Sequence, residues 1–169
     1  MPEPIAGPEP ATLVTPFESP SELATAWRTL LPLAVTDILV FDRDLKEGDW
    51  NSPERNDVLR RFLLDSRRAR LQIVVHDTRQ IEAHLPRLVA LLRDFSHKVQ
   101  ILRTVEEGRN ARDAFAIIDD RHVLHRFHQD FVRGELSLHA PTKARELKNR
   151  LDEILLFTEP GVNATQLGL

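Results

Sequence analysis

Short apolar runs alternate with amphipathic helical stripes through the middle of this chain. Three of the runs, at residues 37–42, 71–76 and 99–103, are bounded by polar residues. Runs of this length with no polar face are typical of strands that are covered on both sides in a parallel sheet. The two intervening segments, 52–68 and 85–95, carry apolar residues at helical spacing. The alternation therefore predicts a β-α-β-α-β unit, with its helices packed on a sheet.

The rest of the chain extends this unit with further strands and two more helices. A first helix is predicted from residue 21, and a hairpin from residues 114–118 and 122–127, joined by an acidic turn. Another strand is predicted at 135–139 and a last helix at 141–157. We therefore expect a three-layer α/β/α sandwich with a mixed, partly parallel sheet.

A chain of 169 residues suits a single domain, which we assign to residues 21–158. Residues 1–20 contain six prolines and scattered glutamates, so they are predicted to form a flexible tail. Removal of residues 1–18 is accordingly expected to leave folding intact. Residues 159–169 are predicted to form a C-terminal tail.

Composition narrows the function classes. The chain has no cysteine, which excludes disulfides, thiolate metal sites and cysteine nucleophiles. Its formal charge of −3 gives no overall attraction for polyanions, so nucleic acid is not an expected partner. No apolar run is long enough to span a membrane and no secretory leader is visible, so we expect a cytoplasmic protein.

The order of elements resembles one half of the phospholipase D-like fold. The similarity rests on a strand ending in residues 116–121 that is followed closely by His122-Val123-Leu124. The stretches 40–45, 50–53, 73–79 and 125–128 are also similar to a bacterial domain family that accompanies acetyltransferases of the GNAT type. The resemblance implies a single phospholipase D-like half, with a second copy of the chain or an acetyltransferase as protein partner.

The resemblance also bears on catalysis, because phospholipase D enzymes use a His-x-Lys-x4-Asp motif. Its three positions fall here on Asp113, Phe115 and Asp120, so both the nucleophile and the charge-neutralising lysine are missing. The expected function is a non-catalytic binding or regulatory module without cofactor or metal. The alternative is a hydrolase of a phosphate ester or nucleic acid that uses Asp42, Asp44, His76 and His125.

Ligands of open α/β sheets bind beyond the carboxyl ends of the parallel strands, which suggests where to look for a site. The candidate ligand-binding residues lie there or on the hairpin, and they are Asp42, Asp44, Trp50, His76, Arg103, His125, Arg126 and His128. Strand alternation places Arg126 and His128 on one face, where they form the best candidate pair for an anionic small molecule. The competing interpretation is that the acids cap loops and that Arg126 pairs with a nearby aspartate.

Three histidines of the hairpin region, His122, His125 and His128, are also candidates for a metal site. On one extended strand His122 and His128 would lie roughly 20 Å apart, with His125 on the other face. A shared metal ion is therefore not predicted.

Overall fold

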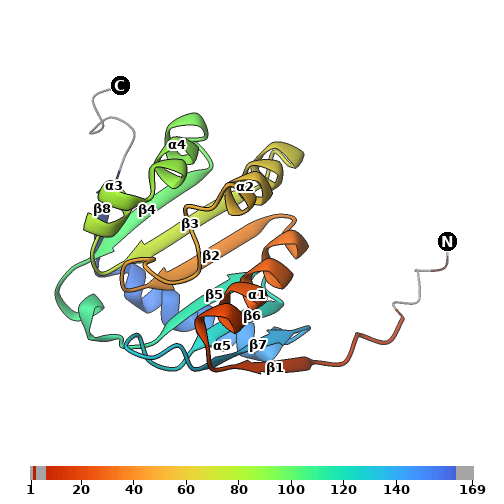
Figure 1. Ribbon diagram of the computed structural model, residues 1–169. Helices are drawn as coiled ribbons and strands as arrows, with labels where there is room; N and C mark the ends of the chain where they lie inside the picture. The colour runs from red at the N-terminus through yellow and green to blue at the C-terminus, as the bar shows by residue number, and fades with distance from the viewer. Residues whose placement is uncertain (1, 3–6, 163–169) are drawn as a thin grey trace.

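The computed structural model describes residue 2 and residues 7–162 as one eight-stranded sheet with helices on both faces (Figure 1). The strands are β1 (Leu13–Phe17), β2 (Asp37–Asp42), β3 (Arg70–Val75), β4 (Val99–Thr104), β5 (Ala114–Ile118), β6 (His122–Arg126), β7 (Gly134–Leu138) and β8 (Thr158–Val162). The helices are α1 (Pro20–Leu30), α2 (Pro53–Asp65), α3 (Arg79–His84), α4 (Pro86–Asp94) and α5 (Pro141–Leu155), with short 3-10 helices η1 (Leu31–Leu33) and η2 (Glu106–Asn110).

The strands follow the order β1-β7-β6-β5-β2-β3-β4-β8 across the sheet. The central strands β2, β3 and β4 run parallel, as the buried apolar runs predict. Every other pairing is antiparallel, and this makes the sheet mixed. Helices α1 and α2 begin where Ser19 and Ser52 accept hydrogen bonds from backbone amides of the first turn, each followed by a proline.

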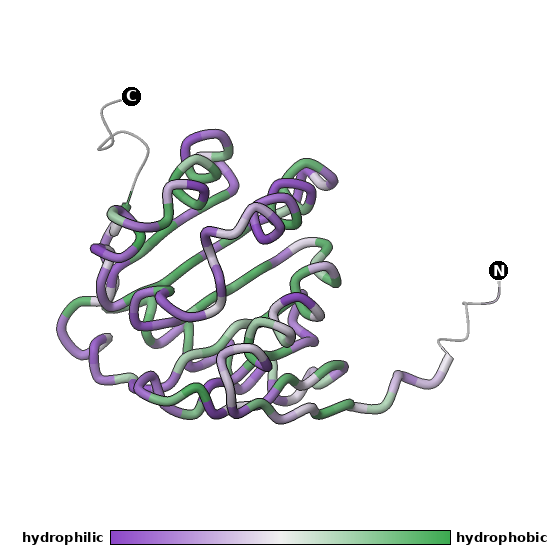
Figure 2. The backbone as a smooth tube through the Cα atoms, viewed as in Figure 1, coloured by the Kyte–Doolittle hydropathy of each residue, from purple (hydrophilic) through white to green (hydrophobic). Residues whose placement is uncertain are grey.

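Helices α1 to α4 cover one face of the sheet, and α5 covers the other (Figure 1). Successive strand residues alternate between these layers: Ile38 and Val40 of β2 join the core under α1, α2 and α4, whereas Leu39 and Phe41 join the core under α5. Hydrophobic residues accordingly run along the strands inside the molecule (Figure 2). The predicted three-layer α/β/α sandwich with a mixed sheet is confirmed.

The structure differs from the predicted tails at both ends of the domain. Strand β1 lies within the expected N-terminal tail and pairs with β7, from Leu13 opposite Leu138 to Phe17 opposite Gly134. Strand β8 lies largely within the expected C-terminal tail and pairs with β4. Four of the five β1 residues are exposed, so backbone pairing alone holds most of this strand and no apolar run marks it. Residues 1, 3–6 and 163–169 of the expected tails lie outside the described part of the chain.

No helix in the described part of the chain is both long enough and apolar enough to cross a membrane.

Candidate functional site

Strand direction brings several of the candidate residues to one end of the sheet, which we call the carboxyl end. The parallel strands β2, β3 and β4 finish there, and the antiparallel hairpin places the start of β5 and the finish of β6 beside them. Asp42, His76, Arg103, Arg126 and the segment around Asp113 therefore lie at this end. They do not line one cleft, because the alternation of side chains distributes them over both faces of the sheet.

On the face under α1 and α2, Asp42 and Arg126 are both buried, with side chains 10% and 7% exposed. The Arg126 Nη1 atom lies 3.8 Å from the Asp42 Oδ1 atom. The carboxylate also accepts hydrogen bonds from the backbone amides of Arg43 and Leu45. Arg126 donates to the carbonyl oxygens of Gln129 and Phe131, so it holds the following loop in place and has little surface left for a ligand.

Burial raises the pKa of Asp42 to about 6, and the charge of Arg126 only partly opposes this effect. Because this folded-state pKa lies above the unfolded value near 4, the charged form is disfavoured in the native protein. The free energy of unfolding should therefore gain a contribution from Asp42 as the pH falls through 6.

We expect this contribution to disappear in Asp42→Asn. Between pH 7 and pH 5 the stability of the unmodified chain should rise by about 1 kcal/mol relative to the variant, because Asp42 takes up its proton in this interval. Urea unfolding of both proteins at the two pH values measures how the pH change alters the free energy of unfolding of each. Subtracting the value of the variant from that of the unmodified chain removes the contribution of the other titrating groups, which both proteins share. A difference of the opposite sign would contradict a raised pKa for Asp42.

On the face under α5, Asp113 is held by two side-chain partners. Arg150 of α5 donates to both carboxylate oxygens over 2.6 and 2.7 Å, and the Nε2 atom of His125 lies 2.8 Å from Oδ2. Burial alone would raise the pKa of Asp113, but the hydrogen bonds from Arg150 and His125 outweigh it and hold the pKa well below its usual range. The residue in the nucleophile position of the phospholipase D motif is thus a fixed carboxylate, and Phe115, in the lysine position, is buried beneath α5.

His76 lies on the same face, and both of its ring nitrogens are occupied. Nε2 lies 2.8 Å from the carbonyl oxygen of Ala111, which can only accept, so Nε2 carries the proton. Nδ1 then accepts from the hydroxyl of Thr104 over 2.6 Å. Burial lowers the pKa of His76, which favours this neutral form. His76 therefore has no free nitrogen for attack on a substrate.

Burial is the main cause of the lowered pKa of His76, and the positive charges of three arginines at the carboxyl end lower it further: Arg112, Arg43 and Arg109. Arg43 follows β2 and forms an ion pair with Asp130. Arg109 and Arg112 lie between β4 and β5, and both are exposed. Arg109 makes one long hydrogen bond to a backbone carbonyl, and Arg112 has no side-chain partner among residues 7–162.

The remaining predicted residues have other surroundings. Trp50 is buried against Trp27, with ring centroids 5.0 Å apart, and does not face a cleft. Asp44 accepts the amide of Lys46 in a turn, and Arg103 forms an ion pair with Glu159 of β8. His128 lies beyond the end of β6 in the loop 127–133, half-exposed, so it does not share a strand face with Arg126.

The histidines of the hairpin have separate partners. His122 accepts the amide of His139, His125 contacts Asp113, and His128 accepts the amide of Asp130. Within the residues that the structure describes, no three histidine or acidic side chains gather as they would around a metal ion.

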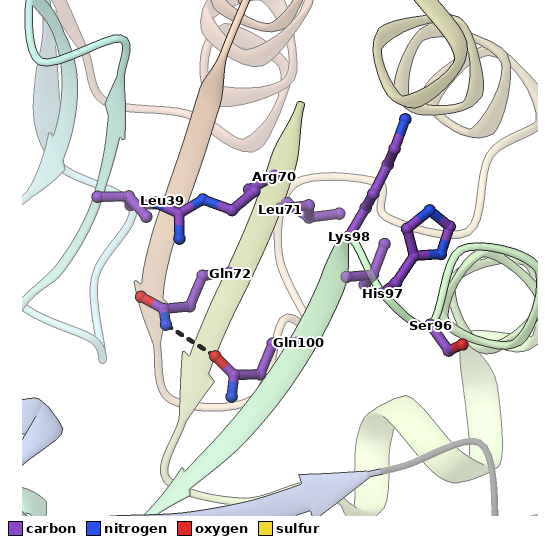
Figure 3. Close-up of a pocket in the computed structure, with 9 residues that line it drawn as sticks. Leu39, Arg70, Leu71, Gln72, Ser96, His97, Lys98 and Gln100 are labelled. Carbon is purple, nitrogen blue, oxygen red and sulfur yellow. Dashed lines mark hydrogen bonds between the residues drawn. The ribbon is translucent and has the colours of Figure 1, made fainter. Parts of the chain in front are cut away.

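A hollow of about 320 Å³ lies elsewhere, beside the starts of β3 and β4 (Figure 3). Gln72 and Gln100 are hydrogen-bonded across it over 2.9 Å, with Arg70 and Lys98 nearby. None of the predicted site residues lines this hollow.

Sequence reasoning missed Arg43, Arg109 and Arg112. A signal for two of them is present in the sequence, because Arg109 and Arg112 are three residues apart in the loop that follows a parallel strand. Such loops lie at the carboxyl end of the sheet. The partnership of Arg150 with Asp113 has no comparable signal, since 37 residues separate them and α5 carries several other cations.

Solved structures share this fold at low sequence identity. The archaeal chromatin protein TrmBL2 matches with a TM-score of 0.62 and 15% identity over 88% of this chain, which spans only 55% of TrmBL2. Nuc from Salmonella typhimurium, described as a phospholipase D family member, matches with a TM-score of 0.57 and 13% identity over 89% of this chain and 98% of its own. NucT from Helicobacter pylori matches with a TM-score of 0.55 and 14% identity over 89% of this chain and 99% of its own. The fold is therefore phospholipase D-like.

No protein with curated annotation matches the chain significantly. One family model covers residues 19–158, which is most of the chain. The chain thus belongs to the family described as "Domain of unknown function (DUF7931)".

Proposed function

We propose that the chain is a non-catalytic module that binds phosphate-bearing ligands at the carboxyl end of its sheet. The proposal rests on two hydrogen bonds that hold neighbouring loops against His76. The carbonyl of Arg43 accepts from its backbone amide over 2.9 Å, and the carbonyl of Ala111 accepts from its Nε2 atom over 2.8 Å. The loop of Ala111 also carries the exposed Arg109 and Arg112. A guanidinium group offers a planar fork of donors that matches phosphate oxygens. This site replaces the pair Arg126 and His128 as the place where an anion would bind.

The ion pairs of the neighbouring acids support the assignment of this site, because they do not involve Arg109 or Arg112. Three acids at this end already have arginine partners: Asp77 is paired with Arg79, Asp130 with Arg43, and Glu159 with Arg103. Arg109 and Arg112 have no carboxylate partner among the described residues. Glu106 and Glu107 belong to the same short helix as Arg109, so binding should depend on guanidinium hydrogen bonds more than on net charge.

Two features of the site argue against phospholipase D chemistry. That mechanism needs an imidazole that attacks phosphorus and a cation that neutralises its oxygens. Asp113 would repel a phosphate, and Phe115 provides no positive charge.

The chromatin protein TrmBL2 binds DNA, so a protein that contains a similar fold has a polyanion as its partner.

The test is a calorimetric titration with inorganic pyrophosphate. We expect the double variant Arg109→Ala/Arg112→Ala to bind at least tenfold more weakly, because two charge-assisted contacts are lost. The matched control is Arg67→Ala/Arg68→Ala, which removes two exposed arginines at the opposite end of the sheet. Equal losses in the two double variants would contradict the assignment.

A hydrolase remains the second candidate because His125 and Asp113 form a hydrogen-bonded pair. With Nε2 turned to the carboxylate, Nδ1 has no partner among the described residues. We expect no hydrolysis of bis(p-nitrophenyl) phosphate with Mg²⁺, with Mn²⁺ or with a chelator. Turnover that disappears in His125→Ala would establish the hydrolase instead.

Association with a second copy or with a GNAT-type acetyltransferase stays a prediction. Light scattering at high micromolar concentration tests the homodimer, and a monomer throughout that range would contradict it. Co-purification with a tagged acetyltransferase of the same source tests the second association.

A further inference from the structure

Two phenylalanines protrude from the loop 127–133, next to the arginines of the proposed site. Phe127 is 48% exposed and Phe131 is 65% exposed, and they are the aromatic members of the large apolar side chains found exposed in the described residues. They line an open hollow of about 460 Å³ together with His128, Val132 and the ion pair of Arg133 with Glu18. Aromatic side chains normally contribute to a core, so two at the surface of one loop require a reason.

The loop is held firmly despite its exposure. The backbone amide of Phe127 donates to the carbonyl of Arg133 over 3.1 Å and closes the loop at its base. From inside, the buried guanidinium of Arg126 donates to the carbonyls of Gln129 and Phe131. Arg126 and the bond at the base therefore hold the backbone of the loop that carries the two rings.

The loop is also joined directly to the arginine-bearing segment 109–113. The buried Gln129 donates its backbone amide to the carbonyl of Arg112 over 2.7 Å and its side-chain amide to the carbonyl of Asp113 over 2.9 Å. The ion pair between Arg43 and Asp130 makes a second connection across the same region. These bonds place the loop of the exposed Phe127 and Phe131 beside the segment that carries the exposed Arg112.

We propose that this surface binds single-stranded nucleic acid, with Phe127 and Phe131 stacking on bases and with Arg109 and Arg112 contacting the phosphates. The inference rests on the proposed function for its phosphate contacts. Proteins that bind single strands combine such aromatic platforms with a positively charged track. A duplex keeps its bases stacked on one another and offers no free face to the rings, so the surface favours a single strand.

This inference departs from the expectation that nucleic acid is not a partner. That expectation rests on the net charge of −3, which averages over the whole chain. At the carboxyl end three acids are paired with arginines, whereas Glu106 and Glu107 have no ion-pair partner among the described residues. Arg109 and Arg112 lie in the segment that is hydrogen-bonded to the aromatic loop. Local charge, not the total, determines contacts with a phosphate backbone.

The test uses a fluorescein-labelled oligothymidylate of about twelve nucleotides and fluorescence anisotropy in 50 mM salt. We expect Phe131→Ala to weaken binding about tenfold through the loss of one stacked base, while pyrophosphate affinity stays unchanged. The matched control is Leu64→Ala, which truncates an apolar side chain of nearly equal exposure, 66%, on α2. A duplex of the same length should bind at least tenfold more weakly than the single strand.

The outcomes separate the two proposals. Loss of pyrophosphate and oligonucleotide binding in Arg109→Ala/Arg112→Ala, with no effect of Phe131→Ala, would overturn the stacking surface and leave the anion site intact. Absence of pyrophosphate binding in the unmodified chain would overturn the proposed function itself. If Phe131→Ala instead converts a dimer to a monomer in light scattering and leaves oligonucleotide affinity unchanged, the aromatic loop is a self-association surface and the inference is wrong.

Discussion

Gly134→Ala is expected to lose more than about 3 kcal/mol of stability, or to fail to fold, because three parts of the sheet converge on this residue. A methyl group there would lie 2.1 Å from the carbonyl oxygen of His125 and 2.9 Å from the Cα atom of Arg126. It would also lie 2.6 Å from the ring of Phe17. Two of these atoms are backbone atoms of β6, so the clash can be relieved only if the paired strands β6 and β7 move apart.

Urea unfolding measures this effect, with Gly7→Ala as the control. No atom lies within 4 Å of a methyl group placed at Gly7, so that variant should unfold at the same midpoint as the unmodified chain. A midpoint for Gly134→Ala close to that of the control would show that β1, β6 and β7 do not pack as described.

Deletion of residues 1–18 is expected to lower the melting temperature by about 10 °C, contrary to the expectation from composition. The deletion removes β1 and with it Phe17, whose side chain is 2% exposed in the core beneath α1. Loss of a buried phenylalanine costs about 3–5 kcal/mol, and each kcal/mol shifts the melting temperature of a domain of this size by about 2–4 °C.

Deletion of residues 1–10 is the control, because residues 7–10 are exposed and belong to no element of secondary structure. Its melting temperature should stay within about 2 °C of the full chain. Calorimetric scans of the two deletions, together with Phe17→Ala, compare the contributions. Equal melting temperatures for the two deletions would instead support the interpretation of residues 1–18 as a dispensable tail.

The central fold could be predicted because its signals are local. Runs such as Asp37–Asp42 alternate with helices whose starts carry Ser52 and Pro53, and both features depend only on neighbouring residues. Strands β1 and β8 could not be predicted in this way. Each contains a proline, and pairing with β7 and β4, far away in the sequence, gives them their structure.

The end of the sheet at which Asp42 and His76 lie could be predicted, whereas the partners of the other candidate residues could not. The rule for open sheets indicated the carboxyl end, where Asp42 and His76 do lie. Sequence alone does not show that Arg126 donates its hydrogen bonds to carbonyls of its own loop, or that Arg150 holds Asp113 by hydrogen bonds. These partnerships depend on packing between α5, β5 and the loop after β6, which no spacing rule describes.

In the proposed function, phosphate-bearing ligands bind at the carboxyl end of the sheet through Arg109 and Arg112. The most direct measurement is a titration of the ¹⁵N-labelled chain with pyrophosphate, followed by two-dimensional NMR. We expect saturable shifts confined to the amides of His76 and of residues 109–113 and 127–133. Shifts that gather instead around the hollow at residues 96–100, or no shifts at millimolar pyrophosphate, would contradict it.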